Sequence, residues 1–169
     1  MSFFARYKAE LLETLAIVLA TVLSYLIARA LNLAEPFWAV ITAAIVARLT
    51  ARVAVYAAVY RLAATLAGAI YGLLLAFARP SGLPEPLLLP LLVAPLGLLA
   101  VFQPRLRAAL IAGIIVFSAA AHLDTPVAPA LARIMEVGLG AVVAAAISVL
   151  FGLIFTLPPR KTRPGAGNP

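Results

Sequence analysis

Three charged residues inside long apolar runs could do chemistry in this sequence: Arg61, Arg133 and Glu136. A charge at the centre of a membrane helix costs at least about 2.5–3.5 kcal/mol unless it is paired or solvated, so such residues usually have a function. The planar guanidinium group of arginine matches the geometry of a carboxylate. We therefore predict that Arg61 is an anion ligand in a polar cavity, with an ion pair to Glu13 as the structural alternative.

Arg133 and Glu136 are three positions apart and can pair on one helical face, which would fix helix packing. If they contact a substrate instead, Arg61 and Arg133 would form two successive positions for an anion. Tyr60 adjoins Arg61 and could contact an aromatic substrate, although tyrosines are equally common as anchors at the membrane interface. Trp38 is expected in the aromatic belt at the outer interface.

Catalytic and metal chemistry has little support in the remaining residues. The chain has no cysteine and a single histidine, His122. His122 stands near Asp124 and could relay protons, but a lone histidine in a loop is more commonly just solvated. No spacing resembles a metal site, a phosphate-binding loop or a nucleophile–base pair. We expect no enzyme activity, no metal and no cofactor.

The composition indicates an all-α integral membrane protein. Of the 169 residues, 65% are hydrophobic and 11% are charged, whereas a soluble domain has roughly 45–50% apolar and about 25% charged residues. The mean hydropathy is +1.12. The net charge of +7 would suggest nucleic acid as a partner of a soluble protein, but here the expected partner is the lipid bilayer.

Charged residues and Pro/Gly clusters divide the chain into six apolar stretches. A helix that crosses about 30 Å of hydrocarbon needs roughly 20 residues, so the second and fourth stretches are short. The fourth also contains Pro90 and Pro95, which remove backbone donors. The predicted spans are Leu11–Leu31, Pro36–Leu49, Val53–Ala78, Leu87–Phe102, Leu106–Leu123 and Pro129–Leu157.

Basic residues predict the orientation of the six spans. Nine of them fall on one side, whereas the opposite connections hold Arg79 alone. The positive-inside rule then places both termini in the cytoplasm. We expect a transmembrane module over residues 1–157 and a disordered basic tail over 158–169. The nine residues are Arg6, Lys8, Arg48, Arg52, Arg105, Arg107, Arg160, Lys161 and Arg163.

An internal repeat is suggested by spans three and six. Arg61 is followed seven positions later by Gly68, and Arg133 is followed seven positions later by Gly140, each glycine preceding an alanine. Three spans per half would put the two halves in opposite orientations, as in many transporters whose sites lie where such repeats meet. The halves would cover about residues 8–78 and 84–157.

Small residues predict close helix packing. Gly68 and Gly72 form a GxxxG pattern, and Gly140 begins a similar pattern with Ala144. Such patterns let helix backbones approach closely in lipid, within one subunit or between two.

Three runs of the chain resemble the fusaric acid resistance and aromatic acid exporter families. One is Pro-Phe-Trp-Ala-Val-Ile-Thr-Ala-Ala at positions 36–44, and another is Ala-x-x-Arg-x-x-x-Thr-x-x-Gly-Ala around Arg61. The Arg-x-x-Glu-x-x-x-Gly stretch from Arg133 also resembles the end of the six-span module of that family. The resemblance covers about residues 8–157, although alanine stands at positions 63 and 64, where glycine is usual.

This resemblance implies a bacterial inner-membrane protein that exports aromatic or other organic acids. Larger members carry two such modules, so a single module implies a homodimer. The plant aluminium-activated malate channels look distantly similar, and they are dimeric anion channels with basic residues along the pore. The expected substrate is therefore an organic anion.

Two functions of different classes follow. The first is a six-span transporter or channel for organic, chiefly aromatic, acid anions, with Arg61 and Arg133 as ligands and Tyr60 and Glu136 beside them. The second is a membrane scaffold or accessory subunit that transports nothing, in which the arginines form buried ion pairs and the small residues contact a partner.

Overall fold

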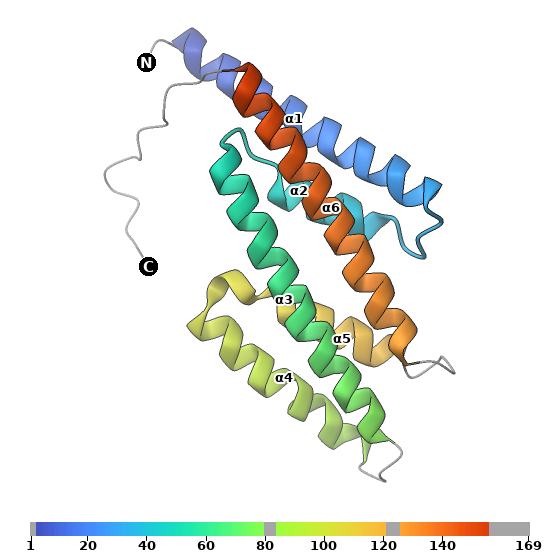
Figure 1. Cartoon of the computed structure of the whole chain (residues 1–169). Coiled ribbons are helices and arrows are strands. Elements are labelled where there is room, and N and C mark those ends of the chain that lie inside the picture. Colours follow the sequence, from blue (N-terminus) through green and yellow to red (C-terminus); the bar gives the residue numbers. More distant parts are fainter. Residues whose placement is uncertain (1–2, 80–83, 121–125, 156–169) are drawn as a thin grey trace.

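The computed structural model describes residues 3–79, 84–120 and 126–155, and these residues form helices and no strand. The all-helical membrane fold is thus confirmed. His122, Asp124 and the basic tail lie outside the described residues. Six α-helices follow one another in the chain (Figure 1): α1 (Phe3–Ala30), α2 (Phe37–Val46), α3 (Ala51–Ala78), α4 (Glu85–Phe102), α5 (Ala108–Ala119) and α6 (Val127–Ile154).

The helices differ in length more than the sequence predicts. Helices α1, α3 and α6 are long and apolar enough to cross a membrane. Helix α2 has 10 residues and α5 has 12, which corresponds to about 15 and 18 Å at 1.5 Å per residue. Neither helix can cross about 30 Å of hydrocarbon alone. The shortest helices are therefore the second and fifth, whereas the sequence suggested the second and fourth.

Proline marks the start of several helices. Pro36, Pro84 and Pro126 occupy the N-cap positions of α2, α4 and α6. Proline suits the edge of a helix because it fixes φ near the helical value and has no N–H group to leave unpaired. Helix α2 ends where the N–H group of Arg48 donates to Ser148 Oγ of α6, at 3.1 Å, instead of continuing the helical pattern.

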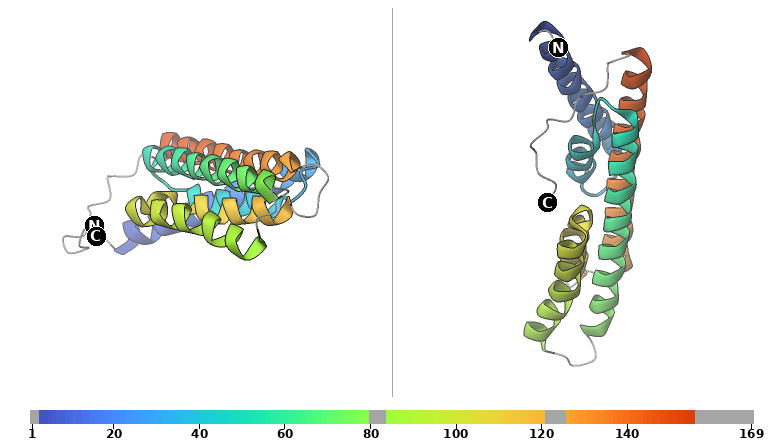
Figure 2. Two further views of the ribbon diagram at one scale, coloured as in Figure 1. Left: turned by 90° about the horizontal axis from the view of Figure 1, so that it is seen from below. Right: turned by 90° about the vertical axis from the view of Figure 1, so that its left-hand side faces the viewer.

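The helices form two groups around a central pair. Helices α3 and α6 lie side by side, α1 and α2 pack with α6, and α4 and α5 lie against α3 (Figures 1 and 2). Each short helix thus packs on the long helix from the other part of the chain. In Figure 1 the starts of α1, α3 and α5 and the ends of α2, α4 and α6 all lie toward the left.

Small residues make up the buried face of α1, while most of its large apolar residues face outward. Helix α1 buries Ala16, Ala20, Ser24 and Ala28, which recur every four residues and so share one face. Many leucines, valines and isoleucines are exposed on the outer faces of the same helices. This pattern suits a protein surrounded by lipid, where close backbone contact rather than apolar burial holds the helices together.

Glycines permit the two closest crossings. A Cβ atom added to Gly140 of α6 would collide with the carbonyl oxygen of Ala39 on α2. A Cβ atom added to Gly68 of α3 would collide in the same way with Ala109 of α5, and one added to Gly72 would collide with the carbonyl oxygen of Gly113. Each short helix therefore packs directly against the backbone of a long helix.

A tyrosine compensates for a proline inside α4. Because Pro95 has no N–H group, the carbonyl of Leu91 four residues earlier loses its helical partner. The hydroxyl of Tyr71 on α3 donates to this carbonyl oxygen at 3.0 Å. Such compensation is what lipid requires, because no bulk water is present to satisfy the backbone.

Tyr71→Phe should lower the free energy of unfolding by about 1–2 kcal/mol, because it leaves the Leu91 carbonyl unpaired. Denaturation in mixed micelles, followed by circular dichroism, measures the loss. In a Pro95→Ala background residue 95 supplies its own N–H group, so the same tyrosine change should then cost much less. An equal cost in both backgrounds would contradict this role for Tyr71.

Candidate anion-binding site

A small cavity lies between the central helices and the two short helices. The space open to the centre of a water molecule is about 10 Å³, which suits about one water. The structure brings Arg61, Arg133 and Trp38 together around this cavity. The other lining residues are Thr65, Ala108, Ile111, Ala112, Ile115 and Val137.

Arg133 is surrounded by partners. Its guanidinium nitrogens lie 3.3 Å from an oxygen of Glu35 and 3.3 Å from an oxygen of Glu136. The guanidinium carbon also lies 4.1 Å from the centre of a Trp38 ring, within cation–π range. Only 7% of the Arg133 side chain is exposed. The local pair that the sequence left open is present, with Glu35 as a second carboxylate.

Glu136 and Glu35 connect α6 to the start of α2. Glu136, 1% exposed, accepts a hydrogen bond at Oε1 from the backbone N–H group of Glu35, at 2.6 Å. The indole N–H group of Trp38 donates to Glu35 Oε2, also at 2.6 Å. Two carboxylates, one arginine and one indole thus form a network that fastens α2 to α6.

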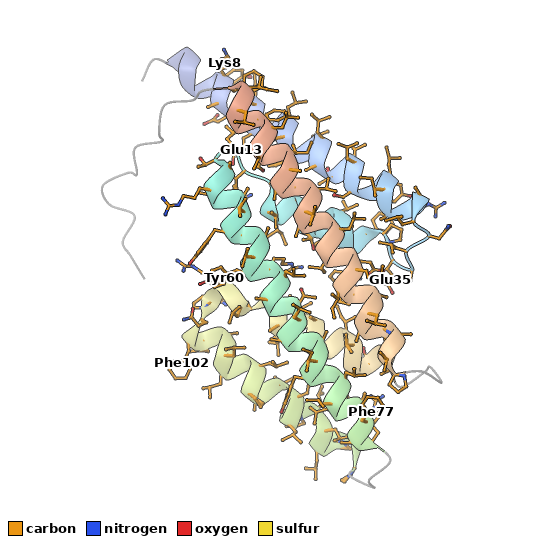
Figure 3. The ribbon with its side chains drawn as sticks, viewed as in Figure 1. Lys8, Glu13, Glu35, Tyr60, Phe77 and Phe102 are labelled. Atoms are coloured by element: carbon orange, nitrogen blue, oxygen red, sulfur yellow. The ribbon has the colours of Figure 1, made fainter. Side chains whose placement is uncertain are left out.

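Arg61 differs sharply from Arg133. The Nε atoms of both arginines are buried without a hydrogen-bond partner, but Arg61, unlike Arg133, also forms no ion pair with any residue that the structure describes. The alternative pair with Glu13 is therefore not formed, and Glu13 lies on α1 (Figure 3). Arg61 is a half-buried cation that lines a cavity and lacks a counter-charge among the described residues.

Tyr60 belongs to a second cluster beside the turn between α4 and α5 (Figure 3). Its ring centre lies 4.6 Å from that of Tyr56, and the two hydroxyls are 3.1 Å apart. Arg105 donates to the Tyr56 hydroxyl at 2.8 Å, and its guanidinium lies 5.3 and 5.6 Å from the two ring centres. Tyr60 does not line the cavity but directly precedes Arg61, which does.

Glu35 and Arg105 are the two residues of this region that sequence reasoning missed. Arg105 was counted only as a charge that sets topology, and Glu35 was not among the predicted site residues. Glu35 and Arg133 are 98 positions apart, so no helical spacing could connect them. The available signal was the place of Glu35 next to the Pro-Phe-Trp run that begins at residue 36.

These features define a class: a helical membrane protein with several apolar helices and a buried charged site between them. The family model for fusaric acid resistance protein-like proteins matches residues 19–147, about three quarters of the chain. The chain belongs to this family, and the predicted resemblance to it is confirmed. No curated protein and no solved structure matches the chain.

Proposed function

We propose that this protein carries organic acid anions, chiefly aromatic ones, across the membrane, with Arg61 as a ligand for the substrate carboxylate. Membership of the fusaric acid resistance-like family supports a membrane transporter or resistance protein. The observation that carries the finer proposal is the unpaired guanidinium of Arg61 at a cavity between helices. A half-buried cation without a counter-charge favours an anionic ligand, and arginine offers a carboxylate two parallel hydrogen bonds.

Arg133 is the second proposed position for the substrate. It already contacts two carboxylates, so a substrate must compete there with Glu35 and Glu136. Glu35 is the partner that can leave, because its side chain is 63% exposed, whereas Glu136 is buried. Arg61 should therefore bind the anion more tightly, and Arg133 should hold it more briefly.

We further propose that the halves 8–78 and 84–157 are an inverted repeat with the site at their interface. Gly68 meets Ala109 as Gly140 meets Ala39, so each half places its short helix on the long helix of the other. Each helix of the first half also runs opposite to its equivalent in the second half (Figure 1): α1 opposite to α4, α2 opposite to α5 and α3 opposite to α6. Transporters with this symmetry commonly bind substrate near the membrane midplane.

The proposed orientation puts the left-hand end of Figure 1 in the cytoplasm. Four basic residues lie at or next to helix ends on that side, and the positive-inside rule favours the cytoplasm for them. We propose a bacterial inner membrane location and a homodimer. The four residues are Arg48, Arg52, Arg105 and Arg107.

Uptake of labelled benzoate into liposomes that contain the purified protein tests the proposed function. Arg61→Ala should reduce saturable uptake at least about tenfold, since it removes a charged hydrogen-bond donor worth roughly 1.5–3 kcal/mol. Arg61→Lys should retain part of the uptake, because it keeps the charge but loses the two-pronged geometry. Arg52→Ala, which removes an exposed charge from the start of α3, is the matched control and should transport normally.

Absence of saturable flux for any organic acid, from protein that is folded and monodisperse, would favour the scaffold function. Normal flux in Arg61→Ala would be consistent with transport but would contradict the assignment of Arg61 as a substrate ligand.

A further inference from the structure

Arg61 and Arg133, the two arginines that line the cavity, are equivalent under the proposed repeat, but their surroundings have opposite charge. Arg61 corresponds to Arg133, 72 positions later, and Ala64 then corresponds to Glu136.

The short helices α2 and α5 have a register of their own. Ala39 meets Gly140 as Ala109 meets Gly68, so residues 70 positions apart correspond, and Arg105 is the equivalent of Glu35. In the same register Trp38 corresponds to Ala108, and both residues line the cavity.

The site around Arg133 contains two carboxylates, whereas the corresponding site around Arg61 contains none among the described residues. On one side Arg133 lies between the carboxylates of Glu35 and Glu136. On the other side Arg61 has Arg105 in place of one carboxylate and Ala64 in place of the other. The Arg133 site therefore has carboxylates of its own, while the Arg61 site has two cations and no carboxylate from the described residues.

We infer that a substrate carboxylate binds beside Ala64, between Arg61 and Arg105, in the position that corresponds to the carboxylate of Glu136 in the other half. This inference rests on the proposed function and deepens it, because it assigns Arg105 as a further ligand and gives the substrate carboxylate a definite place.

The packing around Ala64 places this residue against the start of α5. Ala64 is fully buried in a cluster with Ala109, and Leu106 packs against the same cluster. A carboxylate beside Ala64 would thus lie at the start of α5, close to the turn that carries Arg105. This turn is at the protein surface, and Arg105 and its neighbour Arg107 are exposed, so a ligand can approach from that end.

The tyrosines beside Arg105 favour an aromatic acid. Arg105 uses one donor on Tyr56 and forms no ion pair within the described part of the chain, so most of its five donors remain for a carboxylate. Tyr56 is 48% exposed and offers a ring face next to the guanidinium. An acid that contacts Arg105 can place its own ring against Tyr56 or Tyr60, in the offset or edge-to-face arrangement that aromatic pairs favour.

Ala64→Glu tests the inference, because it would place a resident carboxylate where the substrate carboxylate is expected. Benzoate uptake should fall at least about tenfold, while Ala64→Gln, of the same size but neutral, should retain much more. Arg105→Ala should raise the KM for benzoate about tenfold without a similar loss of kcat. Arg107→Ala, a neighbouring exposed arginine, should leave KM unchanged.

Competition by cyclohexanecarboxylate measures the aromatic preference, since this acid has the charge and nearly the size of benzoate but no π face. The wild type should prefer benzoate, and Tyr56→Leu should reduce that preference.

If both Ala64 variants unfold, the KM of Arg105→Ala for benzoate decides whether Arg105 is a substrate ligand. A normal KM in Arg105→Ala, in a protein whose flux depends on Arg61, overturns this inference alone. Absence of flux in the wild type overturns the proposed function itself.

Discussion

Gly140→Ala is expected to lower the free energy of unfolding by about 3 kcal/mol, although alanine is the better helix former. The added Cβ atom would collide with the carbonyl of Ala39, so α2 and α6 would have to separate. Because the Arg133 network also joins these helices, the separation would weaken the ion pair to Glu35 as well. Thermal unfolding in detergent, followed by circular dichroism, measures the effect.

Gly97→Ala is the matched control for this change. Gly97 lies inside α4, and a Cβ atom there would meet nothing within 4 Å. That substitution should be neutral or should stabilise the protein by up to about 1 kcal/mol. Equal effects of the two glycine substitutions would show that the contact of α2 with α6 tolerates a methyl group.

Glu136→Ala is expected to cost about 3–5 kcal/mol, because it leaves a buried arginine without its buried partner. Arg133 would retain only Glu35, which is largely exposed, and the N–H group of Glu35 would lose its acceptor. Glu136→Gln should cost less, since the amide oxygen can still accept that hydrogen bond. The same unfolding experiment measures both variants.

A double substitution separates charge burial from packing. Combining Glu136→Ala with Arg133→Met removes the unpaired charge, so the double variant should be more stable than Glu136→Ala alone. Glu35→Ala, which removes the exposed partner, should cost only about 1 kcal/mol. A Glu136→Ala variant that is as mild as Glu35→Ala would mean that water already solvates Arg133.

The six helices could be predicted because hydrophobic runs and prolines mark their bounds directly. The shortness of α5 could not, since residues 106–123 are apolar enough for a longer span. Its start is set by a turn at Pro104–Leu106. GxxxG spacing likewise predicted that Gly68 and Gly72 approach another helix, but only the fold identifies Ala109 and Gly113 as the neighbours.

The buried charges could be predicted from the sequence, but their partners could not. Spacing along one helix indicates the Arg133–Glu136 pair, because three positions separate these residues. Nothing in the sequence distinguishes Arg61 with a Glu13 partner from Arg61 without one, since that depends on how α1 packs. Tyr71 is a similar case: Pro95 predicts an unpaired carbonyl, but the donor on α3 is known only from the structure.

The small interior residues bear on how this chain can change over evolutionary time. In a soluble protein large apolar side chains fill the core, and those positions resist substitution. Here the buried face of α1 is Ala16, Ala20, Ser24 and Ala28, whereas its leucines face lipid. Exchanges among leucine, isoleucine and valine on the outer faces change little, but any enlargement of an interior alanine separates two helices. We expect the exposed leucines of α1 to drift among homologues and its buried alanines to persist.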